Sequence, residues 1–147
     1  MNTPQYTTYQ LDGKRFTSRL PPTTRLSQQI RDEAGIKSVK VGCNAGDCGA
    51  CSVLLDGQPV CACLTPLAQV AERNVETVTG LMADEPLTQA LSQSFLEHGA
   101  VQCGMCTPAM LVAATALHRT HAAPSELQVK DALGGVLCRC TGYRKII

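Results

Sequence analysis

The sequence has few aromatic residues, almost no net charge and no long hydrophobic run. Its 147 residues include no tryptophan, three tyrosines and two phenylalanines, and 13 lysines and arginines oppose 12 aspartates and glutamates. This composition, with 44% hydrophobic residues, excludes a disordered tail and gives no basic footprint for nucleic acid. No apolar run reaches the ~18 residues of a membrane-spanning helix. The polar N-terminus resembles no secretory signal, so we expect a cytoplasmic protein, with export beside a signal-bearing partner left open.

Cysteine, in contrast, is abundant. The chain has nine cysteines, and this odd number leaves at least one thiol outside any internal disulfide pairing. In a reducing compartment, clustered cysteines are typically metal ligands or redox groups. The cysteines form one group in each half of the chain, which favours two separate metal sites: Cys43, Cys48, Cys51, Cys61 and Cys63, then Cys103, Cys106, Cys138 and Cys140.

The first half of the chain has the pattern of a small sheet with one helix. Two Asp-Gly pairs, each between β-rich segments, are typical of type I′ hairpin turns. A threonine pair before an apolar segment that ends in glycine indicates a short capped helix. These signals predict a small α+β fold with hairpin strands at residues 6–11 and 15–20, a helix from Thr23 or Thr24 to Gly35, a second hairpin over residues 52–64 and a closing strand at residues 75–78.

The second half has helical periodicity instead. Apolar residues recur at helical spacing, a capping-box pattern begins at Ser125, and the segment around residue 112 is apolar on nearly every side, as in a buried helix. We therefore expect a helical bundle with helices over residues 87–95, 109–118 and 125–133 and a fourth beginning at Thr141. The predicted domains are residues 1–80 and 81–147, with the boundary between Gly80 and Glu85.

The spacing Cys43-x4-Cys48-x2-Cys51 is that of a plant-type [2Fe–2S] ferredoxin loop. Glycines within it allow the loop to curl and to direct backbone N–H groups at the sulfurs, which tunes the potential of the cluster. Cys61 or Cys63 can supply the fourth ligand, and strand alternation places both on one face, so it does not choose between them. A zinc site is the alternative for this loop.

A second constellation lies in the helical half. Cys103 and Cys106 precede one predicted helix and Cys138 and Cys140 precede the next, where free N–H groups and the helix dipole favour a negatively charged cluster. Two such pairs define a tetrathiolate site inside the bundle. A [2Fe–2S] cluster and tetrahedral zinc are both compatible with this spacing.

Together, the two constellations resemble the iron–sulfur small subunit, or N-terminal module, of the xanthine oxidase family of molybdenum hydroxylases. The resemblance extends from residue 26 to residue 143. Its most specific motifs are the following two: Gln102-Cys103-Gly104-Met105-Cys106-Thr107-Pro108 and Leu137-Cys138-Arg139-Cys140-Thr141-Gly142-Tyr143.

This resemblance implies a β-grasp, plant-type ferredoxin-like domain followed by an all-α four-helix bundle, each with one [2Fe–2S] cluster. It selects Cys63 rather than Cys61 as the fourth ligand of the first cluster. Gln102 and Cys140 match positions that approach the molybdopterin. The implied ligands are Cys43, Cys48, Cys51 and Cys63 for the first cluster, and Cys103, Cys106, Cys138 and Cys140 for the second.

The implied function is electron transfer in an oxidoreductase, with no substrate chemistry in this chain. Electrons would leave a molybdopterin cofactor in a large partner subunit, cross the two clusters and reach an FAD-binding subunit or a cytochrome. A free-standing two-cluster carrier is the alternative.

Three positions depart from the family pattern, Asn44, Ala109 and Val136, and none removes a ligand. The chain stops at Ile147, inside what the family continues as a helix, which predicts either a short subunit or a truncated chain.

Overall fold

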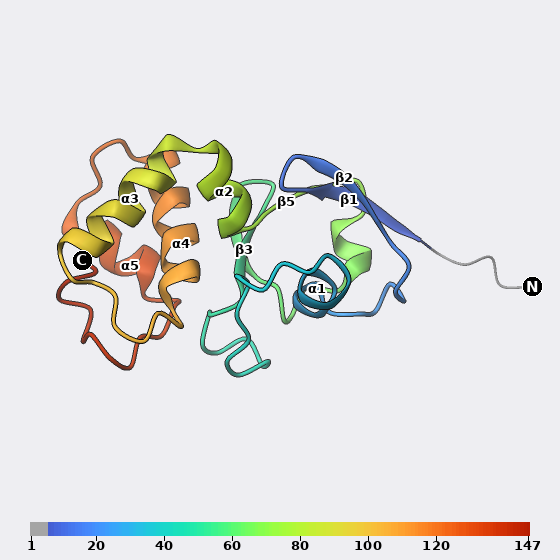
Figure 1. Ribbon diagram of the computed structural model, residues 1–147, viewed down its shortest axis with the longest axis horizontal. Helices are drawn as coiled ribbons and strands as arrows, with labels where there is room; N and C mark the ends of the chain where they lie inside the picture. Colours follow the sequence, from blue (N-terminus) through green and yellow to red (C-terminus); the bar gives the residue numbers. More distant parts are fainter. Residues whose placement is uncertain (1–5) are drawn as a thin grey trace, which may run out of the picture.

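The computed structural model describes residues 6–147, and it places a β-rich half beside a helical half (Figure 1). The first five residues of the polar N-terminus lie outside the described part. Short strands dominate the first half and four helices the second. In chain order the elements are β1 (Thr7–Leu11), β2 (Lys14–Ser18), α1 (Leu26–Gln28), η1 (Gln29–Glu33), β3 (Ser52–Leu55), β4 (Gln58–Cys61), η2 (Leu67–Val70), β5 (Asn74–Glu76), α2 (Val78–Asp84), α3 (Pro86–Glu97), α4 (Thr107–Thr120) and α5 (Glu126–Leu133).

A mixed five-stranded sheet organises the first half, with strand order β2-β1-β5-β3-β4. Both predicted hairpins are confirmed, because β1 pairs antiparallel with β2 and β3 pairs antiparallel with β4. Asp12 and Asp56 have φ of 49°, and the glycines that follow them are also left-handed, as a type I′ turn requires. The last strand, β5, lies between the hairpins and pairs parallel with β1 and antiparallel with β3. The mixed sheet and the helices confirm the α+β class.

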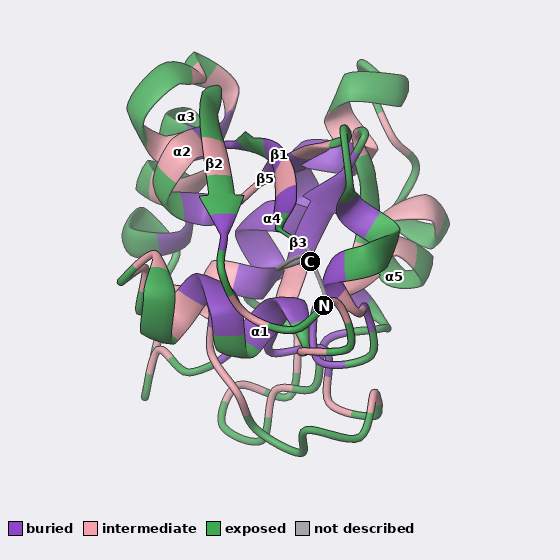
Figure 2. Cartoon of the chain, turned by 90° about the vertical axis from the view of Figure 1, so that its right-hand side faces the viewer, coloured by how far each residue is buried: buried purple, intermediate pink, exposed green. Residues whose placement is uncertain are grey.

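Helix α4 joins the two halves. It is the apolar helix that the sequence marks as buried, and it contacts α2, α3 and α5 as well as strands β3 and β4. Leu54 of β3, which is fully buried, belongs to the same apolar cluster as α4 rather than to the cluster around Tyr9. Figure 2 shows the buried residues gathered in the centre of the molecule, around α4, β3 and β1. The sheet therefore contributes to both apolar clusters.

Two expectations about helices differ from the structure. Residues 78–84 form helix α2, which the sequence pattern did not predict, and the Asp12 carboxylate accepts hydrogen bonds from the Thr77 N–H (2.6 Å) and hydroxyl (2.7 Å) at its start. The helix expected from Thr141 is absent from the residues described up to Ile147, which form turns. Gly142 and Tyr143 have φ of 61° and 66°, and two consecutive left-handed residues are incompatible with the start of a helix.

An ion-pair network also links the halves. Arg119, at the end of α4, bonds both carboxylate oxygens of Glu76 at 3.0 and 2.9 Å and lies against Glu85 between α2 and α3. These hydrogen bonds raise the pKa of the guanidinium above its usual value. The carboxylates of Glu76 and Glu85 are about one-fifth exposed, so water screens these pairs only in part.

Replacing Arg119 by leucine is expected to lower the free energy of unfolding by about 1 kcal/mol, because two carboxylates lose their shared cation. Chemical denaturation of the purified protein measures the change. Lys130→Leu is the matched control, since its ion pair with Glu126 is largely exposed and lies within α5. Equal losses from the two substitutions would show that the network adds nothing beyond an ordinary surface pair.

Among residues 6–147, no helix combines the length and the apolar character needed to cross a membrane.

Candidate metal centres

The first cysteine loop directs a cluster of backbone N–H groups at one sulfur. The N–H groups of Ala45, Asp47 and Cys48 each lie 3.3 Å from the Cys43 Sγ. These bonds, led by those from Ala45 and Cys48, lower the pKa of Cys43 to about 6 and so favour the thiolate that binds metal. The Cys43 N–H in turn donates to the Cys48 Sγ at 3.3 Å. A Cβ at Gly42 would lie 2.8 Å from that sulfur, so the loop closes around it.

Cys51 and Cys63 form the buried side of this site, each only 2% exposed. The Cys63 N–H donates to the Cys51 Sγ at 3.4 Å. Burial raises the pKa of Cys51 to about 12, so without metal this side chain is a neutral thiol. A positively charged iron would offset that burial and favour the thiolate. The pair therefore fits a shielded metal position.

Cys61 and Cys63 do not share one strand, contrary to the expectation from alternation. Strand β4 ends at Cys61, and Cys63 lies in the turn that follows. Cys61 is half-buried, its Sγ lies 3.9 Å from the Gly46 carbonyl oxygen, and burial raises the pKa of its thiol. Its side chain is also near Cys51, so position alone does not exclude it as a ligand.

The second group of cysteines lies in two loops, before α4 and after α5. Cys103 and Cys140 are exposed and lie beside each other, whereas Cys106 is buried and lies beside Cys138. Burial raises the pKa of Cys106 to about 11. Burial also acts to raise the pKa of Cys138, but the hydroxyl and N–H of Thr141 and neighbouring donors lower it to about 7. The Cys138–Cys140 loop does not precede a helix in the described chain, so only Cys103 and Cys106 have the predicted helix start.

The eight predicted ligands thus occur in four pairs: Cys43 with Cys48, Cys51 with Cys63, Cys103 with Cys140 and Cys106 with Cys138. Within residues 6–147, no three cysteine, histidine or acidic side chains converge on a position for a single ion. A [2Fe–2S] cluster takes two protein ligands on each of its two irons, so paired thiols suit it. Both sites therefore fit a binuclear cluster in the chemistry of their donors.

The two sites are joined by a backbone contact. The Leu137 N–H donates to the Cys48 carbonyl oxygen at 2.9 Å. Gly49 has φ of 69°, and a Cβ at this position would lie 2.0 Å from the Gly135 oxygen, so only glycine allows the approach. Cysteine loops from both halves accordingly lie along the same lower edge in Figure 1. A ligand loop of the first site thus touches the residue before a ligand of the second.

Two residues that were not predicted as site residues organise the second loop. The Tyr143 hydroxyl accepts the Cys138 N–H and donates to the Val136 carbonyl, both at 2.9 Å. The Thr141 hydroxyl lies 3.0 Å from the Cys138 Sγ. Their place in the Cys-Thr-Gly-Tyr sequence directly after the last ligand is the signal that could have indicated them.

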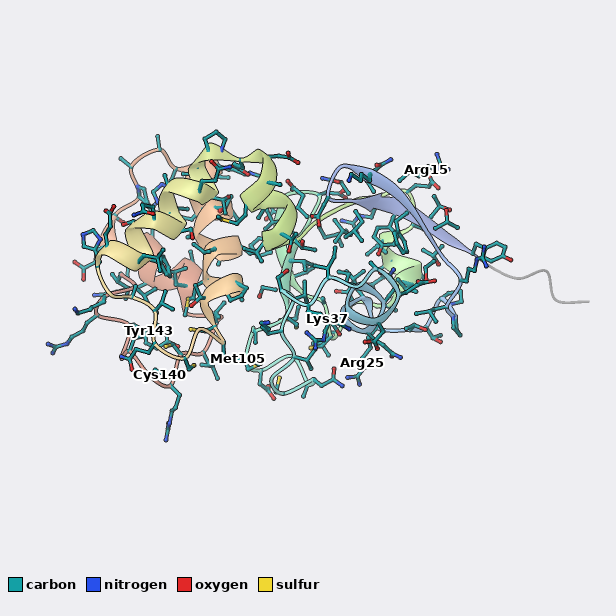
Figure 3. The ribbon with its side chains drawn as sticks, viewed as in Figure 1. Arg15, Arg25, Lys37, Met105, Cys140 and Tyr143 are labelled. Carbon is teal, nitrogen blue, oxygen red and sulfur yellow. The ribbon has the colours of Figure 1, made fainter. Side chains whose placement is uncertain are left out.

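Exposed residues surround the second site at the edge of the molecule. Figure 3 places Met105, Cys140 and Tyr143 along this same edge. Gln102 is also exposed, in the same loop as Met105. Met105 is 41% exposed and Leu137 59%, so this edge presents two large apolar side chains to solvent.

These features fit one class of protein, an iron–sulfur protein with a ferredoxin-type loop in the first half and a second group of four cysteines in the helical half. Comparison with known proteins agrees. Residues 1–92 match the 2Fe-2S iron-sulfur cluster binding domain family, and residues 77–147 match the [2Fe-2S] binding domain family. The chain belongs to the iron–sulfur subunits and modules of the xanthine oxidase family of molybdenum hydroxylases.

Similar proteins cover nearly the whole chain. The small FeS subunit of nicotinate dehydrogenase from Eubacterium barkeri is 42% identical over 92% of this chain and 86% of its own length. The small subunit of nicotine 6-hydroxylase from Paenarthrobacter nicotinovorans is 39% identical over 94% and 82%. The crystal structure of quinoline 2-oxidoreductase from Pseudomonas putida 86 superimposes with a TM-score of 0.90, at 39% identity, over 97% of this chain and 87% of that one.

Proposed function

We propose that this chain relays electrons through two [2Fe–2S] clusters held at the two sites described above. The protein is the electron-transfer subunit of an oxidoreductase, a molybdenum hydroxylase or dehydrogenase. Each cluster, when bound, accepts and passes on one electron at a time. The proposed ligands are Cys43, Cys48, Cys51 and Cys63 for the first cluster and Cys103, Cys106, Cys138 and Cys140 for the second.

The order of the relay follows from the surroundings of each site. We assign the second site to the electron-donating side, where Gln102 and Cys140 are exposed beside an apolar surface and would face a molybdopterin cofactor in a large partner subunit. The hydrogen bond from the Leu137 N–H to the Cys48 oxygen, 2.9 Å long, is the observation that carries the proposal, since it joins the two ligand loops directly. The first site then delivers electrons to an FAD-binding subunit or a cytochrome.

The chain itself supplies no substrate chemistry. Its residues hold the ligands rigid, exclude water from buried sulfurs such as that of Cys51 and direct N–H groups at exposed ones such as that of Cys43. We assign the first cluster to a domain of residues 1–80 with a β-grasp fold. We assign the second cluster to a domain of residues 81–147, for which we propose the all-α four-helix bundle that the family pattern implies.

Metal analysis tests the proposal. The purified protein is expected to be coloured and to contain about four iron and four acid-labile sulfide per chain, since two binuclear clusters need that number. Iron and zinc are measured together with the visible spectrum and the electron paramagnetic resonance spectrum of the reduced protein. A colourless protein with about two zinc would contradict the proposal and support structural zinc sites.

Partner binding distinguishes the relay subunit from a free-standing carrier. Affinity purification of the tagged chain from its native host is expected to yield a large subunit that contains molybdenum. Met105→Glu should weaken that association, while Leu96→Glu, at a more exposed position on α3, should not. A stable chain with full cluster content and no such partner would favour the carrier.

A further inference from the structure

The Thr141 hydroxyl lies between a ligand sulfur and a backbone donor. Its oxygen is 3.0 Å from the Cys138 Sγ and 3.1 Å from the Tyr143 nitrogen. No other side-chain hydroxyl in residues 6–147 makes a hydrogen bond to a cysteine sulfur. The three donors to Cys43, by contrast, are backbone N–H groups, which a substitution does not remove.

The direction of these two bonds is fixed by chemistry. A backbone N–H can only donate, so the Thr141 oxygen accepts from Tyr143. A thiolate bound to iron can only accept, so with the cluster bound the Thr141 hydroxyl would donate to the Cys138 sulfur. The two bonds form a short chain in which the first polarises the hydroxyl and strengthens the second.

The backbone holds this chain in place. Gly142, between Thr141 and Tyr143, is left-handed with φ of 61°, and this turn brings the Tyr143 N–H back to the Thr141 hydroxyl. At the other end of the residue, the Tyr143 hydroxyl bonds the Cys138 N–H at 2.9 Å. The tyrosine therefore fastens the loop at two points, and the Thr141 oxygen has little freedom to turn away from the sulfur.

We propose that Thr141 raises the reduction potential of the second cluster by donating its hydroxyl proton to the Cys138 thiolate. The proposal rests on the assignment of Cys138 as a cluster ligand. Reduction adds one electron, breaks no bond and makes the ligand sulfurs more negative, and a hydrogen bond to sulfur stabilises that charge. Thr141 is a positioning and tuning residue here, because it acts through Cys138 and not on substrate.

The test compares Thr141→Val with Thr141→Ser in the assembled complex. Each cluster is titrated with reductant while its electron paramagnetic resonance signal is recorded, so the readout is a potential and not turnover. Valine is expected to shift the reduction equilibrium of the second cluster about tenfold toward the oxidised form, which is about 59 mV for one electron. Serine keeps the hydroxyl and should keep the wild-type potential, and the first cluster should be unchanged in both.

Thr107→Val is the matched control, since it makes the same change beside Cys106 and removes no hydroxyl that contacts a sulfur in the described chain. An unchanged potential in Thr141→Val, with both clusters present, would overturn the proposal. If the Thr141→Val protein loses the second cluster, the smaller substitution Thr141→Ala serves for the same comparison. Loss of the cluster from Thr141→Ala as well would show that Thr141 is needed to hold the cluster, and it would overturn the proposal that Thr141 tunes the potential. A wild-type protein without a second cluster would instead refute the proposed function.

Discussion

Replacing Cys63 by serine is expected to abolish the first cluster, whereas replacing Cys61 by serine should leave both clusters in place. Cys63 is 2% exposed and its N–H bonds the Cys51 Sγ, so the two sulfurs form the buried pair of the site. Cys61 is half-buried at the end of β4, with its sulfur near the Gly46 carbonyl. Iron in the Cys63→Ser protein should fall from about four to about two per chain.

Electron paramagnetic resonance of the reduced protein is expected to distinguish the two clusters and so to show which one is lost. Cys106→Ser is the companion variant, because it should remove the second cluster and leave the first. Equal loss of iron from Cys61→Ser and Cys63→Ser would contradict the assignment. So would a Cys61→Ser protein that lacks the first cluster while Cys63→Ser retains it, since the ninth thiol would then be the true ligand.

Replacing Gly49 by alanine is expected to separate the two cysteine loops. Gly49 has φ of 69°, and the added Cβ would lie 2.0 Å from the Gly135 oxygen and 3.0 Å from the Val136 Cα. These neighbours are backbone atoms, so no side-chain rotation relieves the overlap. The left-handed conformation and the overlap together should cost roughly 2–5 kcal/mol. The apparent Tm of the cluster-loaded protein should fall by roughly 5–15 °C.

Gly57→Ala is the control for conformation alone. Gly57 has φ of 81° in the second hairpin turn, and a Cβ there would meet nothing within 4 Å. Its cost should be roughly 1–2 kcal/mol, and it should not alter the transfer of electrons between clusters. A Gly49→Ala protein that melts no lower than Gly57→Ala would show that the close approach of the loops contributes nothing to stability.

Local signals predicted most of the secondary structure. Asp12-Gly13 and Asp56-Gly57 marked both hairpin turns, because few residues other than these tolerate the left-handed conformation. Periodic apolar residues marked α3, α4 and α5 to within two residues at each end. Ser125 and Gln128 form the predicted capping box. In each case the decisive interaction lies within a few residues along the chain.

The two wrong predictions about helices concern places where the structure depends on a contact between distant residues or on an unusual backbone conformation. Helix α2 starts where the Asp12 carboxylate bonds Thr77, and these two residues are 65 positions apart in the sequence. The helix expected after Thr141 is prevented by the left-handed backbone of Gly142 and Tyr143, and a tyrosine gives no sequence signal for that conformation. The local sequence pattern therefore could not predict either feature.

In the candidate sites, too, local sequence patterns predicted some features, whereas others depend on the folded structure. Spacing indicated which cysteines belong together, because one loop must present three thiols at once. It did not choose between Cys61 and Cys63, because both residues lie near Cys51 in the folded chain. It also gave no role to Thr141 or Tyr143, whose effect comes from hydrogen bonds that the folded loop creates.

The contact between Gly49 and Gly135 has a consequence for which amino-acid substitutions this protein tolerates. Electron transfer between two centres weakens steeply with the distance between them. Between the two proposed centres, one backbone lies directly on another, with no side chain between them. Substitutions at neighbouring exposed positions such as Leu137 can therefore adapt the surface to a new partner without altering the spacing of the centres. The speed of the relay and the specificity of docking are free to vary independently.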